Sequence, residues 1–160
     1  MLIRPATDVD RPAVLAIVAP VLAAGETYAT ARDLTDAQVL DYWFEPAHEV
    51  FVAEADGAIL GTYYLMANRR GGGSHVGNCG YITAAAAQGK GVARAMGQHS
   101  IARAIERGFR AIQFNNVIST NTRAVALWQS LGFAIVGTLP GAFHHPVNGY
   151  VDAYVMFKTL

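Results

Sequence analysis

The chain has 160 residues, with 12 Lys and Arg against 12 Asp and Glu, so its formal net charge is zero when histidine is neutral. Hydrophobic residues make up 52% of the chain and charged residues 15%, which supplies a core for one domain and excludes an intrinsically disordered protein. A nucleic-acid-binding domain normally carries an excess of positive charge, so we expect small-molecule or protein partners and no nucleic acid.

Cysteine usage and hydropathy exclude several further classes. The single cysteine, Cys79, excludes an internal disulfide and a multi-cysteine zinc site. The longest apolar run, residues 13–24, is too short for a membrane-spanning helix and contains Pro20. The first residues lack the segments of a signal peptide, so we expect a cytoplasmic protein without membrane contact. Zero net charge gives weak repulsion between copies and is compatible with a homodimer.

The first half of the chain predicts strands and helices in alternation. In order, these are a strand at 2–4, a helix capped by Thr7 and Asp8 that ends at 24–25, a helix from Thr35 to Trp43, and strands at 50–55 and 58–66. The Asp56-Gly57 pair between the last two strands is a strong signal for a two-residue hairpin turn. A glycine-rich turn at 68–74 then leads to a strand at 75–83.

The second half continues with the same alternation. It predicts a helix at 91–107 that ends at Gly108, a strand at 111–117, an amphipathic helix that ends at Gly132, and strands at 133–139 and 149–158. The resulting order, one strand, two helices, three strands, helix, strand, helix and two strands, predicts a mixed sheet with helices on its faces.

The most informative segment is Gln88-Gly89-Lys90-Gly91, which joins a predicted strand to a predicted helix. Its glycines permit a positive φ and a close approach of the backbone to a ligand. The first N–H groups of a helix have no internal partner, and they bind phosphate oxygens with help from the helix dipole. The segment therefore predicts an anionic, phosphate-bearing ligand, with tight packing as the alternative role of the glycines.

Two common phosphate-binding motifs do not fit this segment. A Walker A loop needs Ser or Thr after Gly-Lys, where the chain has Gly91. A Rossmann fingerprint that starts at Gly89 needs Gly or Ala where the chain has Arg94. Neither a P-loop nucleotide site nor a dinucleotide site is therefore expected.

Two motifs in order resemble those of the GCN5-related N-acetyltransferase (GNAT) family. The pattern Q-x-x-G-x-A at 88–93 matches the Q/R-x-x-G-x-G/A motif that binds the acyl-CoA pyrophosphate in that family. The pattern N-x-x-A-x-x-L-W-x-x-L-G-F at 121–133 resembles the family's Asn-led helix with its terminal Gly-Phe. The order of predicted elements is similar as well, so the resemblance covers nearly the whole chain.

The resemblance implies one acyl-CoA N-acyltransferase domain over residues 1–160, of class α/β (α+β). Its mixed, mostly antiparallel sheet would have six to seven strands and about four flanking helices. Acetyl-CoA is the implied cosubstrate, and no metal is implied. The backbone of Ile82 and Thr83 would pair with the pantetheine arm, and Asn121 would bond to the arm near the thioester, although asparagine is also a common helix N-cap. The residues that would hold the pyrophosphate are Gln88, Gly89, Lys90, Gly91, Val92 and Ala93.

One position departs from the family pattern. Many members have a tyrosine, which can protonate the leaving thiolate, where this chain has Trp128. An indole N–H is a hydrogen-bond donor and not an acid at neutral pH. We therefore expect Trp128 to pack in the core, and the thiolate to leave without a dedicated acid, since thiols titrate near pH ~8.5.

The implied reaction is direct attack of an amine on the thioester, which requires deprotonation of the ammonium form and stabilisation of an oxyanion. Asn78 and Asn115 are the predicted catalytic amides, with hydrogen bonding at the strand ends as their alternative role. Glu26 is the candidate base, acting directly or through water, or else a solvated carboxylate. Thr27 and Tyr28 would line the acceptor pocket.

The patterns S-H-x-x-N-x-G at 74–80 and F-N-x-V-x-x-T-N at 114–121 resemble fungal acetyltransferases that act on proline analogues such as azetidine-2-carboxylate. This resemblance favours a small-molecule amine, an amino acid or an analogue of one, as the acceptor. Two alternatives are a protein N-terminal or lysine acetyltransferase and a non-catalytic acyl-CoA sensor.

Histidine and cysteine give no further catalytic signal. The five histidines are scattered, so we expect no metal site, and the adjacent His144 and His145 would point to opposite faces of a strand. Cys79 should be a small buried residue on the sheet face opposite Asn78, and not a nucleophile.

Overall fold

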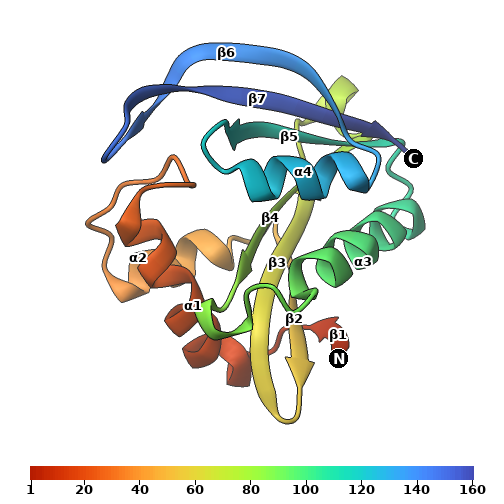
Figure 1. The fold of residues 1–160 in the computed structure, drawn as a ribbon. Helices are drawn as coiled ribbons and strands as arrows, with labels where there is room; N and C mark the ends of the chain where they lie inside the picture. Colours follow the sequence, from red (N-terminus) through yellow and green to blue (C-terminus); the bar gives the residue numbers. More distant parts are fainter.

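Seven strands form one open sheet, and four α-helices cover its two faces in the computed structural model, which describes residues 1–160 (Figure 1). The strands are β1 (Leu2–Pro5), β2 (Glu49–Ala55), β3 (Ala58–Ala67), β4 (Val76–Thr83), β5 (Ala111–Ile118), β6 (Ala134–His145) and β7 (Gly149–Thr159). The helices are α1 (Arg11–Ala24), α2 (Asp36–Trp43), α3 (Val92–Glu106) and α4 (Thr122–Ser130). The predicted mixed sheet, with its seven strands and four helices, is confirmed.

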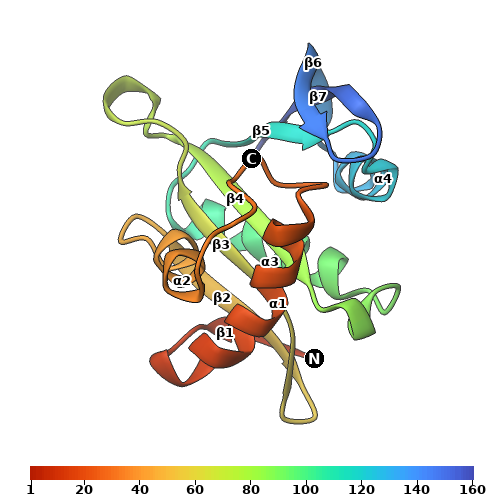
Figure 2. The same ribbon diagram turned by 90° about the vertical axis from the view of Figure 1, so that its left-hand side faces the viewer.

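The strands lie in the order β1-β2-β3-β4-β5-β7-β6, and every neighbouring pair is antiparallel except β4 and β5. This parallel pair is very short, because it joins only Val76 to Ala111 and Gly77 to Ile112. Beyond Gly77 the two strands diverge, as Figures 1 and 2 show. The sheet is thereby opened near its middle.

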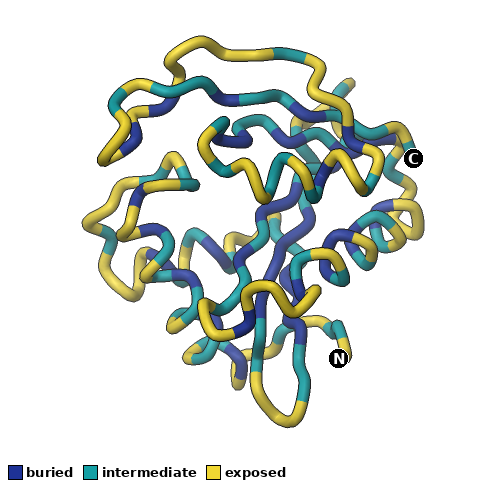
Figure 3. The backbone as a smooth tube through the Cα atoms, in the orientation of Figure 1, coloured by how far each residue is buried: buried dark blue, intermediate teal, exposed yellow.

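Each face of the sheet has its own hydrophobic core. Side chains of α3 and α4, among them Met96 and Trp128, pack with Tyr63 and Phe114 on one face. Side chains of α1 and α2 form the second core, with the fully buried Trp43 at its centre. Figure 3 shows that burial is concentrated in the central strands and that β6, at the edge, is exposed along most of its length.

Two predicted boundaries are wrong. The helix predicted after Thr7 and Asp8 begins later, at Arg11, after a short 3-10 turn over Asp8–Asp10. Strand β6 continues past the predicted end at 139 to His145, through an irregular stretch around Pro140. Proline has no N–H to donate, but an edge strand tolerates it because one side of the strand has no partner.

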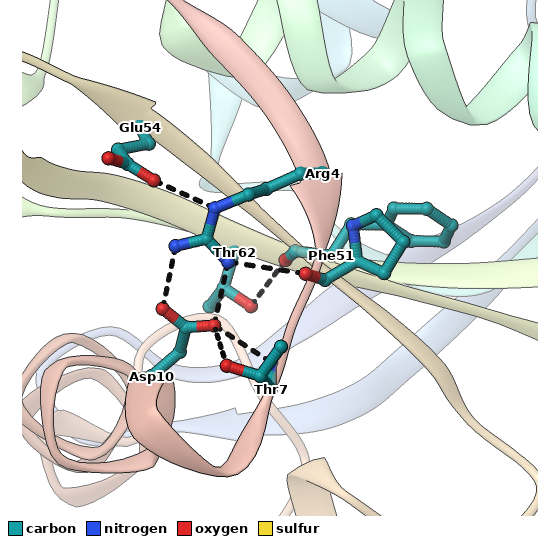
Figure 4. Close-up of polar contacts among 7 residues, drawn as sticks. Arg4, Thr7, Asp10, Phe51, Glu54 and Thr62 are labelled. Atoms are coloured by element: carbon teal, nitrogen blue, oxygen red, sulfur yellow. Dashed lines mark hydrogen bonds and ion pairs between the residues drawn. The ribbon is translucent and has the colours of Figure 1, made fainter.

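Arg4 explains where the N-terminal helix begins (Figure 4). Its guanidinium donates two hydrogen bonds of 2.8 Å to the Asp10 carboxylate and one of 2.7 Å to Glu54 in β2. The Asp10 carboxylate also accepts the backbone N–H of Thr7 at 2.8 Å. Asp10, and not Asp8, is therefore the carboxylate that orders this turn, and the adjacent guanidinium lowers the pKa of Asp10 far below its ordinary value.

The loops also follow their predicted chemistry. Thr35 caps α2 by accepting the N–H of Gln38 at 3.3 Å, and Asp56-Gly57 forms the β2–β3 hairpin turn with a positive φ at both residues. None of the helices is both long enough and apolar enough to cross a membrane.

Candidate active site

A cavity of about 980 Å³ opens where β4 and β5 diverge. Its walls come from the loop after α1, from β4, from the turn before α3, from β5 and from the start of α4. All the predicted site residues line it except Lys90: Glu26, Thr27, Tyr28, Asn78, Ile82, Thr83, Gln88, Gly89, Gly91, Val92, Ala93, Asn115 and Asn121. Segments far apart in the sequence are thus brought to one place.

Strand β4 presents an unpaired backbone edge inside this cavity. Hydrogen bonds from Ala84 N to Leu60 O and from Asn68 N to Val76 O mark the two ends of the β3–β4 ladder. Because bonding alternates along an antiparallel pair, the even-numbered residues of β4 bond to β3. The N–H and C=O groups of Cys79, Tyr81 and Thr83 therefore face the gap toward β5 and can pair with an extended ligand.

This parity refines one prediction. Thr83 offers its backbone to the cavity as expected, but Ile82 directs its N–H and C=O toward β3. Tyr81 takes the place expected for Ile82. The strand pattern alone does not reveal the parity, because it depends on the register with β3.

The turn before α3 is built for an anion. Gly89 and Gly91 have φ values of 76° and 79°, and no heavy atom lies within 4 Å of a Cβ built at either position. Ala95 makes the first hydrogen bond of the helix, to Gly91 O, so the N–H groups of the first turn have no partner within the helix. These N–H groups can bind phosphate oxygens, as the motif predicts.

The charged side chains that line the cavity are Glu26, Arg94 and Arg123. Arg94 lies in the first turn of α3 and donates to Ser130 Oγ at 3.1 Å, whereas Arg123 lies in the first turn of α4. Neither arginine was among the predicted site residues. A positive side chain in the first turn of a helix is unfavourable beside the positive end of the helix dipole, unless an anion binds there. This position of the two arginines was therefore an available sequence signal for an anion site.

Three tyrosines, Tyr28, Tyr42 and Tyr64, wall the other part of the cavity. Their rings pack around the buried Trp43 indole at centroid distances of 6.1, 6.3 and 5.1 Å. Burial raises the pKa of all three phenols, so at neutral pH they are protonated hydrogen-bond donors. Tyr42 and Tyr64 were missed because they lie in α2 and β3 and have no local motif.

Gly80 makes room for one of these rings. A Cβ at this position would lie 2.6 Å from Tyr64 Cε1, a distance that real side chains do not tolerate. Any residue larger than glycine would therefore displace the Tyr64 phenol from the cavity wall.

The predicted catalytic amides have different surroundings. Asn78 donates from Nδ2 to the carbonyl of Gln113 at 2.9 Å and so bridges the strands where they diverge, while its Oδ1 accepts no protein hydrogen bond. Asn115 is occupied on both sides, because Oδ1 accepts from Gln113 and Nδ2 donates to Asn68. Asn116, which was not predicted, also lines the cavity, at a one-residue bulge in β5.

Asn121 combines the two roles considered for it. Its Oδ1 accepts the N–H of Ala124 at 3.3 Å, which confirms the N-cap alternative. Its Nδ2 has no protein acceptor, and the residue lines the cavity. The cap fixes the side chain so that Nδ2 remains available to a ligand.

Three other expectations are confirmed. Trp128 is buried against Tyr81 and Phe114, at centroid distances of 4.6 and 4.9 Å. Cys79 is buried in the same core, where desolvation raises the pKa of its thiol to about 12, which does not suit a nucleophile. His145 is buried and His144 is exposed, as opposite faces require.

No group of three or more His, Cys, Asp or Glu side chains is placed to hold a metal ion.

Comparisons with known proteins agree with this geometry. The model of the acetyltransferase (GNAT) family matches residues 21–133. A GCN5-related N-acetyltransferase from Kribbella flavida is 48% identical, with a TM-score of 0.94 over 99% of this chain and 97% of that one. The N-acetyltransferase aca1 of Schizosaccharomyces pombe is 28% identical over an alignment of 148 positions, which covers 82% of this chain and 71% of aca1.

A third relative carries a more specific description. The ribosomal-protein-alanine N-acetyltransferase from Brucella melitensis is 27% identical, with a TM-score of 0.86 and full coverage of both chains. The family match spans well over half of the chain, and it includes both motifs and the diverging strands. The chain therefore belongs to the GNAT family and is an acetyl-CoA-dependent N-acetyltransferase.

Proposed function

We propose that this enzyme acetylates the amino group of a small molecule, an amino acid or an amino-acid analogue. The supporting observation is that one cavity carries both the glycine turn before α3 and the wall of Tyr28, Tyr42 and Tyr64. The loop at 26–30 lines this cavity, as expected for a pocket that covers a small acceptor. The similarity to a fungal N-acetyltransferase agrees with the resemblance in the asparagine-containing segments.

In this proposal the backbone holds the cosubstrate. The N–H groups of Gly89, Gly91, Val92 and Ala93 form the pyrophosphate site, with Arg94 adding a positive charge. Gln88 and Lys90, which were also predicted to bind there, instead donate their N–H groups to the carbonyls of Ala85 and Ala87 and so hold the turn. The open edge at Tyr81 and Thr83 pairs with the amides of the pantetheine arm. Asn121 Nδ2 donates to the arm near its thioester end.

Side chains hold and activate the acceptor. Glu26 is the only carboxylate that lines the cavity, and it removes the proton of the ammonium group directly or through water. Asn78 Oδ1 accepts from the amino group, while Asn115, with both sides of its amide occupied, positions the neighbouring backbone. The N–H of Cys79, which faces the gap and is not assigned to the arm, stabilises the developing oxyanion. Thr27 and Tyr28 complete the wall.

A second candidate acceptor is the α-amino group of a protein N-terminus. The 27% identical relative from Brucella melitensis, described as acting on a ribosomal-protein alanine, favours it. A peptide needs a groove that stays open beyond the first residue. The hairpin segment at 143–148, which could close the pocket from the other side, does not line the cavity.

The test is release of free thiol from acetyl-CoA by the purified enzyme. Free amino acids, cyclic imino acids, amino-acid-like herbicides, polyamines and peptides that begin with alanine are compared at equal concentration. A kcat/KM at least tenfold higher for an amino acid or an analogue supports the proposal. A preference for peptides, rising with their length, replaces it with the second candidate.

A cytoplasmic homodimer is also part of the proposal. Zero net charge and the exposed Val136 and Leu139 on edge strand β6 support association between copies. Sedimentation velocity of the purified enzyme over a range of concentrations tests the dimer, and a single monomeric species would refute it.

A further inference from the structure

The loop after α1 is bonded to the backbone edge that we assign to the cosubstrate. The hydroxyl of Tyr28 donates a 3.1 Å hydrogen bond to the carbonyl oxygen of Tyr81. Tyr81 is one of the β4 residues whose backbone groups face the gap and have no strand partner. The Tyr28 side chain, which walls the proposed amine site, thus occupies a carbonyl oxygen of the proposed cofactor site.

The surroundings of Tyr28 hold it firmly in this position. Its ring packs against Trp43, and its hydroxyl remains protonated because burial raises the pKa of the phenol. The loop is fixed at its start as well, where Arg32 Nε donates to Ala23 O at 2.9 Å and the Arg32 side chain covers Gly25. The contact with Tyr81 is therefore a defined feature of this structure.

A second feature of the same loop is an unsatisfied polar atom. Thr30 Oγ1 is the one buried side-chain oxygen or nitrogen that has no hydrogen-bond partner. Buried polar groups are normally paired, so this conformation leaves the loop with a cost that another arrangement can relieve. Thr30 lines the same cavity as Tyr28.

We infer that the Tyr28 hydroxyl and an amide N–H of the pantetheine arm compete for the Tyr81 carbonyl, so that acetyl-CoA binding releases Tyr28 to the acceptor. An added strand takes up the outward carbonyls of the edge that it joins. Tyr28 and Tyr81 line the same cavity, and the Tyr28 hydroxyl lies 3.1 Å from the Tyr81 carbonyl oxygen, so an amide N–H that bonds to this oxygen from the cavity would meet the hydroxyl. Once displaced, the Tyr28 hydroxyl is a buried hydrogen-bond donor without a partner, beside the site of the amine substrate. A carboxylate or carbonyl oxygen of that substrate can then accept its hydrogen bond.

Tyr28 is therefore a positioning residue that couples the two ends of the cavity. Displacement of Tyr28 lowers the affinity for the cosubstrate. The amine substrate can accept a hydrogen bond from the Tyr28 hydroxyl only after the cosubstrate has bound. The inference rests on the proposed placement of the arm along β4.

The test uses CoA as the probe and Tyr28→Phe as the variant, with Kd measured by isothermal titration calorimetry. Removal of the hydroxyl frees the Tyr81 carbonyl, so the variant is expected to bind CoA about three- to tenfold more tightly than the wild type. Tyr42→Phe is the matched control, since it removes from the same wall a phenol hydroxyl that makes no hydrogen bond to β4, and its Kd should stay within twofold. A variant that was merely destabilised would bind CoA more weakly.

Hydrogen exchange on the wild-type enzyme gives an independent readout that needs no variant. Amides at 26–30 should exchange faster when CoA is added without an acceptor, because the loop loses its bond to β4. Equal or weaker CoA binding by Tyr28→Phe, or slower exchange at 26–30, overturns the competition alone. A wild-type enzyme that does not bind CoA overturns the proposed cofactor placement as well.

Discussion

The two ends of the cavity are built from different parts of the chain and from different kinds of atoms. The cofactor end is mostly backbone from one continuous segment, Cys79 to Ala93, with its open strand edge, its glycine turn and the first turn of α3. The acceptor end is made of side chains from separate elements: Tyr28 after α1, Tyr42 in α2, Tyr64 in β3 and Asn78 in β4.

Because of this difference, the two ends of the cavity should respond differently to substitutions. A backbone site depends on φ angles and strand register, so most side-chain substitutions leave it intact and a few glycine substitutions destroy it. A side-chain site changes with every residue that lines it. One fold can therefore keep its cosubstrate while its acceptor varies, and substitutions at the two ends should separate the two functions.

The largest effect is expected at the glycine turn. Gly91→Leu places a side chain in the open space where phosphate is proposed to bind, and should weaken CoA binding more than 100-fold. Gly108→Leu is the control, because Gly108 ends the same helix with nearly the same φ, 78° against 79°, and with equally open surroundings. Both variants should lose about 1–2 kcal/mol of stability from backbone strain, but only Gly91→Leu should lose CoA binding in calorimetry.

Asn78 should separate catalysis from cosubstrate binding. Asn78→Ala removes the free Oδ1 and the bridge to the Gln113 carbonyl, and we expect kcat/KM for the best acceptor to fall about 100-fold. The Kd for CoA should change less than threefold. Gln113→Ala keeps the main-chain carbonyl and should lower kcat/KM less than fivefold. A fall of less than tenfold in kcat/KM for Asn78→Ala would mean that its free Oδ1 does not serve the reaction.

Gly80→Ala should alter the acceptor end alone. The added methyl group displaces the Tyr64 ring, so the KM for the acceptor should rise about tenfold, with a stability loss of about 1–3 kcal/mol in chemical denaturation. The Kd for CoA should stay within threefold. Gly137→Ala is the control, since its Cβ would make only an ordinary 3.9 Å contact with Val155. A matching loss of CoA affinity in Gly80→Ala would show that the two ends are not separable.

The smallest kinetic effect is expected far from both ends, at Asp10. Asp10→Asn breaks the paired contact with Arg4 and should lower the free energy of unfolding by about 2 kcal/mol, with kcat/KM unchanged. The pKa of this carboxyl is lowered in the folded state, so its contribution is complete above pH ~5 and is lost as the pH falls further. Asp8→Asn, which breaks an exposed pair with Arg11, should cost less than about 0.5 kcal/mol.

Urea unfolding between pH 7 and pH 2 measures this pH dependence. The wild-type stability should fall toward that of Asp10→Asn at the acid end, and the two curves should be parallel above pH ~5. A constant difference over the whole range would mean that the Asp10 charge does not carry the effect.

The local patterns predicted most of the elements and the cofactor end, because each depends on a short run of residues. The hairpin at Asp56-Gly57, the Thr35 cap and the positive φ at Gly89 and Gly91 follow from such runs. The errors arose where a distant partner decides. The helix starts at Arg11 because Arg4 and Thr7 both bind Asp10, and β6 continues past Pro140 because β7 pairs with it.

The sequence by itself determined the order of elements and the phosphate-binding turn, and with the family resemblance it indicated the cosubstrate, since periodicity and glycine geometry act over a few residues. Only the tertiary structure decided which backbone groups of β4 are open, that Tyr42, Tyr64 and Asn116 share the cavity with Tyr28, and that Tyr28 is bonded to Tyr81. These features depend on strand register and on contacts between residues tens of positions apart, which no local pattern records.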